Sequence, residues 1–546
     1  MDSHQDMWQE VRVGSEDAVH LVILQHGLHG SPQDYSTFQP ILQSVLRDHG
    51  VYVVSCTSNS KEYLTTHDGI DLGGLRLADE VEQIALQCPM LQKISFIGHS
   101  LGGLYIRYCV GVLYSRGFFS KVQPINFITM ATPNLGIRRP PNKGTISNLF
   151  NVVSSRLFDR TGAQMTLRDT VSDETLSLAS PRSLNFDQIP VFPDCSADLE
   201  LQLPFPNEGY SRLYCTLHAH ELNVYFSHLD VQQPPLFSFD LTEFDAVLFV
   251  PQEESSENAE HEGGDQSESY YNDVPRHRDI VLQLRTKGLG ETAHVDIHVV
   301  TSSDWEFTHG CILRSGSVAC VSYSGDKGSL RNEMVEIPRN QYLMQCLSQG
   351  AFLYGLYVFK RRVVYSNIFF DVQAPYSFSA FRSYNPYRHN AIPCATSAVY
   401  PHITLHSFIN STIFRESINL AKTDESEPKK KTWLHGLADI PAQLFPVNKN
   451  PTSPTHSQHR MFFVVSKDTE HVIVDSPEDA FSSDPLKDVL RGMLMAIQSL
   501  GWERIDVLFE NALAHEYIVA KRSDDIPVSD SGIDVAHHVA DTFLVD

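Results

Sequence analysis

The first 130 residues alternate short apolar runs with amphipathic helical patterns, and this alternation is the feature that most restricts the fold. The apolar runs are Val19–Leu24, Val51–Cys56, Ile94–Ile97 and Ile125–Met130, and helical patterns between them include Phe38–Arg47 and Leu75–Leu86. Runs that are apolar throughout are typical of strands buried on both faces of a parallel sheet. The pattern therefore predicts βαβ units and an α/β fold with a mostly parallel central sheet.

The middle of the chain has a different pattern. From about residue 175, short alternating stretches follow one another without helical patterns between them, which predicts antiparallel strands. Residues 252–273 carry eight Asp or Glu and few aliphatic side chains, so we expect this acidic segment to be a disordered loop. The α/β pattern returns near residue 335, with a helical pattern at 343–359 and strands at 363–370 and 504–509. We therefore divide the chain into a first α/β part at 1–180, a β-rich insertion at 195–325 and a second α/β part at 335–546.

A five-residue motif, Gly98-His99-Ser100-Leu101-Gly102, matches G-x-S-x-G, in which a sharp turn between a strand and a helix exposes a serine hydroxyl. Here the motif directly follows the predicted strand at 94–97 and directly precedes an amphipathic pattern at 104–113. The small flanking residues avoid a clash at such a turn. We therefore predict that Ser100 is a nucleophile, and not part of a glycine-rich turn without a catalytic role.

A second glycine-containing turn, His26–Gly30, follows the first predicted strand. A tetrahedral intermediate needs preorganised N–H donors aimed at its developing negative oxygen. In a fold of this kind one donor lies in this turn, and the other belongs to the residue after the nucleophile. The main-chain N–H groups of Leu28 and Leu101 are the predicted oxyanion hole. His26 and His99, which flank the two turns, are interpreted as packing or hydrogen-bonding residues.

Several segments taken together resemble the eukaryotic putative serine esterase family, a lipase-like group of α/β-hydrolases. In the first part they are HLVILQHGLHG, THDGIDLGGLRLADEV, GHSLGGLYIRY and ATPNLG, and in the last part FKRRVVYSNIFFDVQAP and GWERIDVLFENALAHEYIV. The resemblance covers roughly residues 18–175 and 340–545. It implies an α/β-hydrolase fold and hydrolysis of esters by a Ser-Asp-His triad through an acyl-enzyme.

An activated serine needs a base that takes its proton and a carboxylate that orients the base, and this fold places them in the order Ser, acid, His. Asp371 closes a predicted strand, at the edge where active sites of open α/β sheets gather, and the family resemblance assigns it the acid role. Asp506, inside a predicted strand, is its rival. His515 lies in the loop after the last predicted strand and matches the family's Ala-His block. The adjacent pair His537 and His538, on a late helical pattern expected to face solvent, are the competing bases.

The β-rich insertion, which runs up to Ser302-Ser303-Asp304-Trp305, loosely resembles a pleckstrin-homology-type domain. Most domains of that type that bind phosphoinositides have Lys and Arg between their first two strands, whereas the connection here is His218–Glu221. We therefore expect a role in packing or in protein contacts instead of inositide binding. An insertion unrelated to that domain type is the alternative.

Charge and cysteine content limit the partners and the compartment. Lys and Arg number 42 against 66 Asp and Glu, so the net charge is −24, which would repel nucleic acid and anionic lipid headgroups. The nine Cys include no C-x-x-C pair, and an odd number fits no complete disulfide framework. The polar, acidic stretch Met1–His20 has no apolar run, so we expect no secretory signal, and the longest apolar run, Ala351–Phe359, is too short to span a membrane. We expect an intracellular, cytoplasmic protein with at most peripheral contact with membranes or lipid droplets.

The sequence thus predicts a serine hydrolase that cleaves carboxylic esters, with a lipid as the expected substrate. Motifs for metalloprotease, P-loop or dinucleotide sites do not occur in their required context, so we expect no metal and no cofactor. An amidase or thioesterase with the same triad remains open, because a fold does not determine its substrate. The third hypothesis is a catalytically weak scaffold that binds protein partners through the β-rich insertion.

Overall fold

The fold is seen in a computed structural model of the 546-residue chain. The structure describes residues 12–60, 62–139, 145–181, 189–203, 210–251, 280–286, 294–299, 302–323, 342–382, 385, 397, 399–404, 484–521 and 531–546. The acidic segment at 252–273, predicted to be a disordered loop, lies outside these residues.

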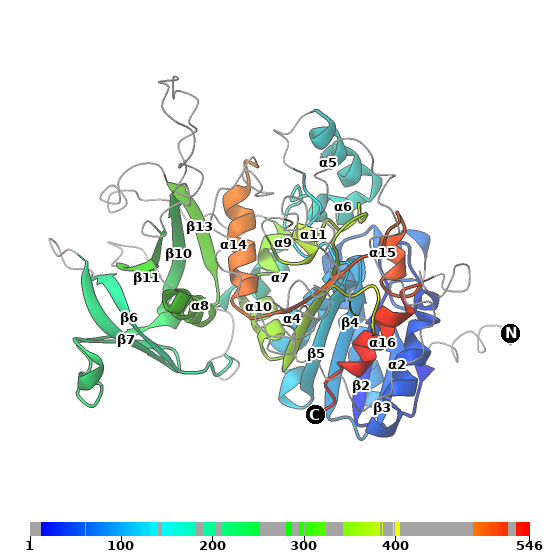
Figure 1. Cartoon of the computed structure of the whole chain (residues 1–546), viewed down its shortest axis with the longest axis horizontal. Coiled ribbons are helices and arrows are strands. Elements are labelled where there is room, and N and C mark those ends of the chain that lie inside the picture. The colour runs from blue at the N-terminus through cyan, green and yellow to red at the C-terminus, as the bar shows by residue number, and fades with distance from the viewer. Residues whose placement is uncertain are drawn as a thin grey trace, which may run out of the picture.

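Seven strands form the first sheet, which we call sheet A (Figure 1). In spatial order they are β1 (Arg12–Val13), β3 (Val51–Ser55), β2 (His20–Gln25), β4 (Lys93–His99), β5 (Gln123–Met130), β14 (Arg361–Asn367) and β15 (Glu503–Val507). All neighbouring pairs are parallel except β1 with β3. The predicted α/β class with a mostly parallel central sheet is therefore confirmed.

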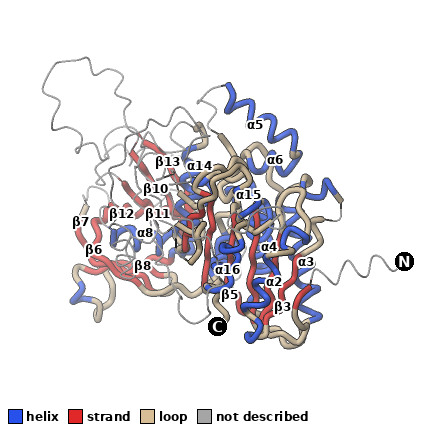
Figure 2. Tube along the Cα trace, turned by 45° about the vertical axis from the view of Figure 1, so that its right-hand side comes forward, coloured by secondary structure: helices blue, strands red, loops and turns tan. Residues whose placement is uncertain are grey.

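Helices cover both faces of sheet A, because successive side chains of a buried strand point to opposite faces. In β2, Leu21 and Ile23 join one core cluster, whereas Val22 and Leu24 join the other. The first cluster includes α3 (Ile70–Gln87), α4 (Leu101–Ser115) and α10 (Gly350–Tyr357), and the second includes α2 (Phe38–Val45) and α16 (Ile533–Asp541). Figure 2 shows α2, α3, α4 and α16 beside the strands of sheet A.

Eight strands form the second sheet, sheet B, at the left of Figure 1. In spatial order they are β13 (Val318–Tyr323), β10 (Phe244–Pro251), β11 (Ile280–Thr286), β12 (His294–Val299), β6 (Cys195–Gln202), β7 (Ser211–His218), β8 (Glu221–Tyr225) and β9 (Phe237–Asp240). All of the pairs are antiparallel except β10 with β13, which are parallel.

The prediction of antiparallel strands alone was wrong at the end of this region. Helix α8 (Ser302–Ser315) links β12 to β13 and packs against sheet B, so the chain can return parallel to β10. Every residue of α8 from Phe307 to Ser315 is buried, including the polar residues Thr308, His309 and Arg314. Polar side chains at several buried positions break the apolar periodicity of a helix, which explains why α8 was not expected.

The connection at His218–Glu221 was also wrongly placed. It joins β7 to β8, the second and third strands of sheet B along the chain, because β6 precedes them. The connection between the first two strands, residues 203–210, contains no Lys or Arg either. The sequence argument against a phosphoinositide site therefore applies to that connection.

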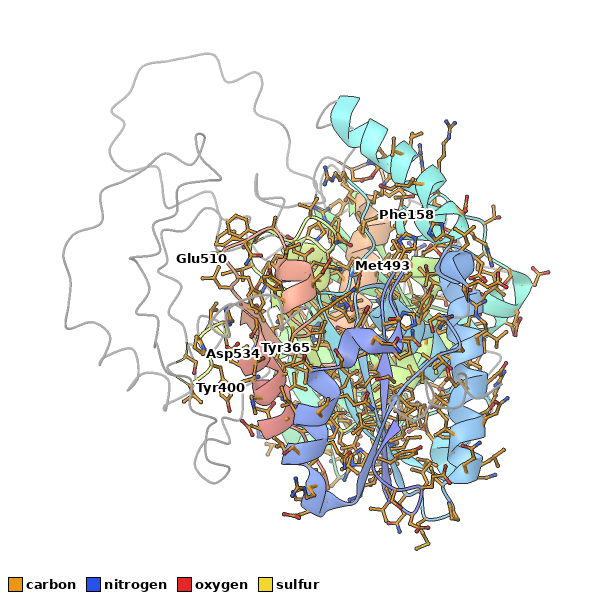
Figure 3. All side chains as sticks on the ribbon, turned by 90° about the vertical axis from the view of Figure 1, so that its right-hand side faces the viewer. Phe158, Tyr365, Tyr400, Met493, Glu510 and Asp534 are labelled. Atoms are coloured by element: carbon orange, nitrogen blue, oxygen red, sulfur yellow. The ribbon has the colours of Figure 1, made fainter. Side chains whose placement is uncertain are left out.

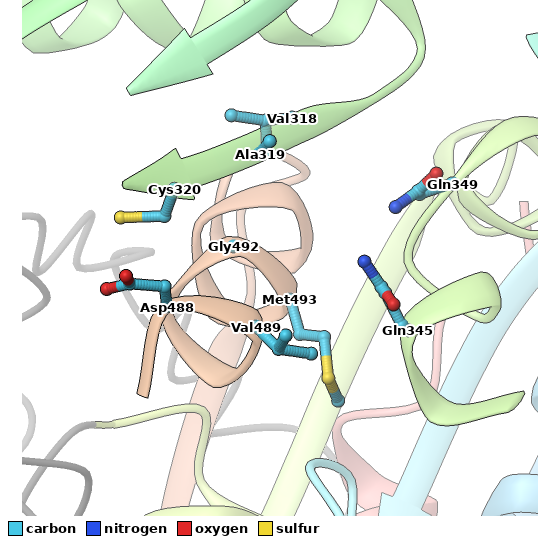
Figure 4. A pocket seen from close by; sticks show the side chains of 9 residues that line it. All are labelled: Val318, Ala319, Cys320, Gln345, Gln349, Asp488, Val489, Gly492 and Met493. Carbon is cyan, nitrogen blue, oxygen red and sulfur yellow. The ribbon is translucent and has the colours of Figure 1, made fainter. Parts of the chain in front are cut away.

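Helix α14 (Lys487–Gln498) lies between the two sheets and packs against β13 (Figure 1). Its buried residues share one core cluster with residues of both sheets. Figure 4 shows a small pocket at this junction, where Cys320 of β13 lies near Asp488 of α14 and Met493 of α14 points toward Gln345. The carboxylate of Asp488 accepts hydrogen bonds from the main-chain N–H and the hydroxyl of Ser322, which ties α14 to β13.

Six further helices are described: α5 (Thr145–Leu157), α6 (Asp159–Met165), α7 (Asp173–Ala179), α9 (Leu343–Cys346), α11 (Tyr376–Ser379) and α15 (Ala514–Tyr517). Helices α5 and α6 follow β5, and α15 follows β15, so they lie at the edge where the parallel strands of sheet A end (Figure 1). Within the described ranges, no helix is both long and apolar enough to span a bilayer.

Candidate active site

Ser100 lies at a sharp turn between β4 and α4. Its backbone has φ 53° and ψ −128°, a left-handed conformation that is strained for a residue with a side chain. The main-chain N–H of Ser100 donates to the carbonyl of Met130 at the end of β5, with an N–O distance of 2.9 Å. The turn has the geometry of a nucleophile elbow, in which the serine hydroxyl stands beyond the end of the sheet.

Glycines allow two segments to approach the elbow closely. A Cβ atom on Gly102 would lie 2.1 Å from the main-chain oxygen of Gln25, so only glycine fits between α4 and the end of β2. A Cβ atom on Gly27 would lie 2.7 Å from the Cβ of Ser100. The turn after β2 therefore passes directly beside Ser100.

The three residues predicted as a triad are brought together. The hydroxyl of Ser100 lies 2.8 Å from Nε2 of His515, and Nδ1 of His515 lies 2.9 and 3.0 Å from the two carboxylate oxygens of Asp371. A carboxylate only accepts hydrogen bonds, so Nδ1 carries the proton and Nε2 is free to accept from the serine hydroxyl. The imidazole is thus in the tautomer that a general base requires.

Asp371 is held by several donors besides His515. Its Oδ1 accepts from the main-chain N–H groups of Gln373 (3.1 Å) and Ala374 (2.8 Å), and its Oδ2 accepts from the side-chain amide of Asn367 (2.9 Å). The Asp371 side chain is only 1% exposed, so these bonds replace the water that the carboxylate gives up on burial. The carboxylate therefore has a fixed position against His515.

Two local predictions about these residues were wrong in detail. Strand β14 ends at Asn367, so Asp371 lies four residues beyond the strand instead of directly closing it. His515 lies on the short helix α15, and not in a loop. Both residues still lie beyond the carboxyl ends of their strands, where β14 and β15 pair in parallel.

Asp506, the competing acid, and His538, a competing base, form hydrogen bonds with other residues. Asp506, fully buried in β15, accepts a hydrogen bond from the hydroxyl of Tyr376 at 2.9 Å. His538 was expected to face solvent, but it is buried on α16, and its Nδ1 lies 2.9 Å from the hydroxyl of Tyr365. Burial lowers the pKa of His538 to about 3. His537, one residue earlier on α16, is partly buried.

The predicted oxyanion donors lie at the two turns beside Ser100. Leu101 is the first residue of α4, where main-chain N–H groups have no partner inside the helix. The turn that contains Leu28 is closed by a hydrogen bond from the N–H of Gly30 to the carbonyl of Gly27 at 3.1 Å. Within the described part of the chain, no acceptor lies in hydrogen-bond contact with the N–H of Leu28 or Leu101.

His26 and His99 are both buried beside the elbow. Nδ1 of His26 donates to the carbonyl of Gly27 (3.0 Å), and Nε2 of His99 donates to the main-chain carbonyl of His515 (2.7 Å). Burial lowers the pKa of both imidazoles below the ordinary value. Asn367 was not singled out in the sequence, although a polar residue at the end of an apolar strand is a detectable signal.

A metal site is not evident in the part of the chain that the structure describes, because no three His, Cys, Asp or Glu side chains there are grouped to hold an ion. The pocket of Figure 4 is lined by β13, α14 and residues near α9, and by none of the three triad residues.

A parallel sheet with a serine at a strand–helix elbow, an acid beyond a later strand and a histidine beyond the last strand defines the α/β-hydrolase class. The family comparison agrees with this class. Residues 15–184 match the family model described as "Putative serine esterase (DUF676)", which confirms the resemblance predicted for the first part of the chain.

Fungal proteins named as lipases are similar to 22% of the chain. "Putative lipase ROG1" of Saccharomyces cerevisiae is 37% identical over 123 residues, which are 22% of this chain and 18% of that protein. "Putative lipase C4A8.10" of Schizosaccharomyces pombe is 34% identical over 128 residues, which are 22% of this chain and 16% of that protein. The alignments therefore span less than a fifth of these relatives' lengths.

Solved structures with local similarity include a thioesterase and a lipase. The RedJ thioesterase of the prodiginine biosynthetic pathway in Streptomyces coelicolor matches with 19% identity and a TM-score of 0.19, over 25% of this chain and 48% of that chain. Lipase B of Aspergillus fumigatus matches with 15% identity and a TM-score of 0.19, over 24% of this chain and 30% of that chain.

Proposed function

We propose that the protein is a serine hydrolase that cleaves carboxylic esters, with Ser100 as nucleophile, His515 as general base and Asp371 as the acid that orients the base. The observation that carries this proposal is the continuous hydrogen-bond series from the Ser100 hydroxyl through His515 to Asp371. A serine hydroxyl alone is a weak nucleophile, and a neutral imidazole within hydrogen-bond distance is what activates it.

The reaction follows from this geometry. Nε2 of His515 takes the hydroxyl proton while the serine oxygen attacks the ester carbonyl, and the N–H groups of Leu28 and Leu101 stabilise the negative oxygen that forms. The same imidazole then gives its proton to the leaving alcohol, which leaves an acyl group on Ser100. Water, activated in turn by His515, releases the acid and restores the serine.

We propose a lipid ester as the substrate. The fungal relatives are named as lipases, and two apolar side chains lie next to the acid and the base. Val372, directly after Asp371, is 66% exposed, and Leu513, two residues before His515, is 38% exposed. Exposed apolar residues this close in sequence to the acid and the base favour an acyl chain over a polar substrate.

A fluorophosphonate probe tests the nucleophile. Wild type should be labelled, and Ser100→Ala should not be labelled and should lose at least about 10³-fold in ester hydrolysis, because alanine has no hydroxyl for His515 to activate. Ser115→Ala, at the far end of the same helix, is the matched control and should label normally. Labelling retained in Ser100→Ala would contradict the proposal.

The substrate class needs a second measurement. Rates on p-nitrophenyl esters of increasing chain length, with a matched thioester and anilide, should rise with chain length and favour the oxygen ester. A higher kcat/KM for the thioester or the anilide would replace the esterase proposal with a thioesterase or an amidase.

A further inference from the structure

We infer that His99 and Asn367 are positioning residues that hold the base His515 from two sides, an arrangement that we call the base clamp. This inference rests on the proposed function, because it concerns the residue that acts as base there. Helix α15, which carries His515, has only four residues, and a helix of this length is not stable on its own. Contacts from the rest of the protein must therefore set the place of the imidazole.

His99 holds α15 from the side of the nucleophile. Its Nε2 donates to the main-chain carbonyl of His515 at 2.7 Å, and the two imidazole rings lie 5.0 Å apart between centroids. A carbonyl only accepts, so Nε2 of His99 carries a proton. Because His99 directly precedes Ser100 at the end of β4, one short segment fixes both the nucleophile and the backbone of the base.

Asn367 holds α15 from the side of the acid. Its Nδ2 donates to Oδ2 of Asp371 at 2.9 Å and to the main-chain carbonyl of Ala514 at 3.1 Å. Both partners only accept, so the amide must point its NH₂ group at them, and its orientation is fixed by the contacts. Asn367 is 1% exposed at the end of β14, where the strand holds its backbone.

The two contacts act on consecutive peptide units. The carbonyl of Ala514 is held from β14 and the carbonyl of His515 from β4, two strands separated in sheet A by β5. The same Asn367 amide also reaches Asp371, so it sets the distance between acid and base. A shift of about 1 Å in a catalytic group lowers the rate on the order of 10²-fold, which is the loss expected without the clamp.

Paired substitutions at His99 test the clamp. The amide nitrogen of Gln lies at about the reach of Nε2, whereas that of Asn lies nearer to Nδ1 and cannot reach the carbonyl of His515. We therefore expect His99→Gln to keep most of the wild-type kcat on a p-nitrophenyl ester. His99→Asn should lower kcat with KM unchanged.

Asn367→Leu removes both donated hydrogen bonds at similar volume and should lower kcat on the order of 10²-fold with KM unchanged. The NMR signal of the proton on Nδ1 of His515 should broaden or shift in this variant, because the Asp371 carboxylate that accepts this proton loses the donor on its Oδ2.

Two buried residues near the amino ends of β2 and β5, away from the triad, serve as matched controls. Nε2 of His20 lies 2.8 Å from the Ser95 hydroxyl, and Asn126 donates to the carbonyl of Leu544 at 2.7 Å. His20→Asn and Asn126→Leu remove similar buried contacts without touching the triad. They should lower the melting temperature but leave kcat per folded molecule unchanged.

The outcomes separate the clamp from the proposed function. Wild-type kcat in both His99→Asn and Asn367→Leu, with Ser100→Ala still inactive, would overturn the clamp and leave the nucleophile assignment intact. An equal loss of kcat in His99→Gln and His99→Asn would also overturn the clamp, because the loss would then not depend on the hydrogen bond to His515. A similar loss of kcat in His20→Asn or Asn126→Leu would overturn it too, because the effect would then be structural. Labelling retained in Ser100→Ala would overturn the proposed function and the clamp with it.

Discussion

The Ser100 hydroxyl is 2.8 Å from a base that is already oriented by a carboxylate, so the three side chains should function as a unit. We predict that Ser100→Ala, His515→Ala and the double variant lose nearly the same factor in kcat, because removal of either partner already ends activation of the hydroxyl. Single-turnover rates on a p-nitrophenyl ester measure this. Losses that multiply in the double variant would show that the two residues act independently.

The position of the carboxylate gives a second prediction at this scale. Asp371→Asn should lower kcat on the order of 10⁴-fold, because an amide no longer fixes the imidazole tautomer. Asp506→Asn should keep most of the activity per folded molecule, since an amide oxygen can still accept from Tyr376. The two variants are compared in parallel on the same ester. A larger loss in Asp506→Asn would mean that the acid has been misassigned.

The residues of the candidate site could be predicted from the sequence to different degrees. Ser100 could be predicted because its motif is local and its strand and helix are adjacent in sequence. Asp371 and His515 needed the family resemblance, since chain order alone does not choose among many acids and histidines. The contact of His99 with the carbonyl of His515 could not be predicted, because it joins residues 416 positions apart through the packing of sheet A.

At the scale of elements, the elbow depends on a close approach of α4 to the end of β2. A methyl group at Gly102 would meet main-chain oxygens of Gln25 and His26 at 2.1 and 2.5 Å, and a backbone cannot move aside as a side chain can. We predict that Gly102→Ala destabilises the fold by about 3 kcal/mol or more.

Gly117 is the control for this prediction. It has φ +73°, and a Cβ atom added there would meet nothing within 4 Å, so Gly117→Ala costs only the strain of a left-handed alanine, about 1 kcal/mol. Urea denaturation of both variants compares the two costs. Equal destabilisation would show that the close approach at Gly102 is not what requires glycine there.

The central strands of sheet A could be predicted because each is apolar throughout and is followed by a helical pattern. Strand β14 was predicted to extend to residue 370, because Ile368 to Phe370 are apolar, but the strand ends and its pairing stops at Asn367. Helix α8 was missed because buried polar residues such as His309 and Arg314 break its apolar periodicity. The parallel pairing of β10 with β13 depends on that helix, so it was not predicted either.

At the scale of the whole molecule, buried histidines should make the fold sensitive to acid. Burial lowers the pKa of His20 and of His538 to about 3, below the value near 6.5 of an unfolded chain. Between these values the unfolded state binds more protons than the folded state, so the free energy of unfolding falls as the pH falls from 6.5 toward 3. Above pH 6.5 both states are neutral and the effect vanishes.

His538→Asn tests this dependence. His538 contacts Tyr365 through Nδ1, and an Asn amide can keep that contact without titrating. Tyr365 and Tyr400, labelled in Figure 3, have ring contacts with His538, and Asp534 lies on the same helix, α16. Between pH 6 and 4 the variant should lose about 1.4 kcal/mol less per pH unit than wild type. Urea midpoints at each pH measure the slopes, and identical slopes would exclude His538 as a source of acid sensitivity.

The order of the active residues along the chain has a consequence for synthesis on the ribosome. Strand β5 pairs with β14, which emerges only after all of sheet B, and the base follows Ser100 by 415 residues. A nascent chain can form the elbow early, but its serine has no base until the segment around residue 515 leaves the exit tunnel. If the proposed triad is correct, incomplete translation products that lack His515 should be inactive, and we expect hydrolysis only when the last strand of sheet A is in place.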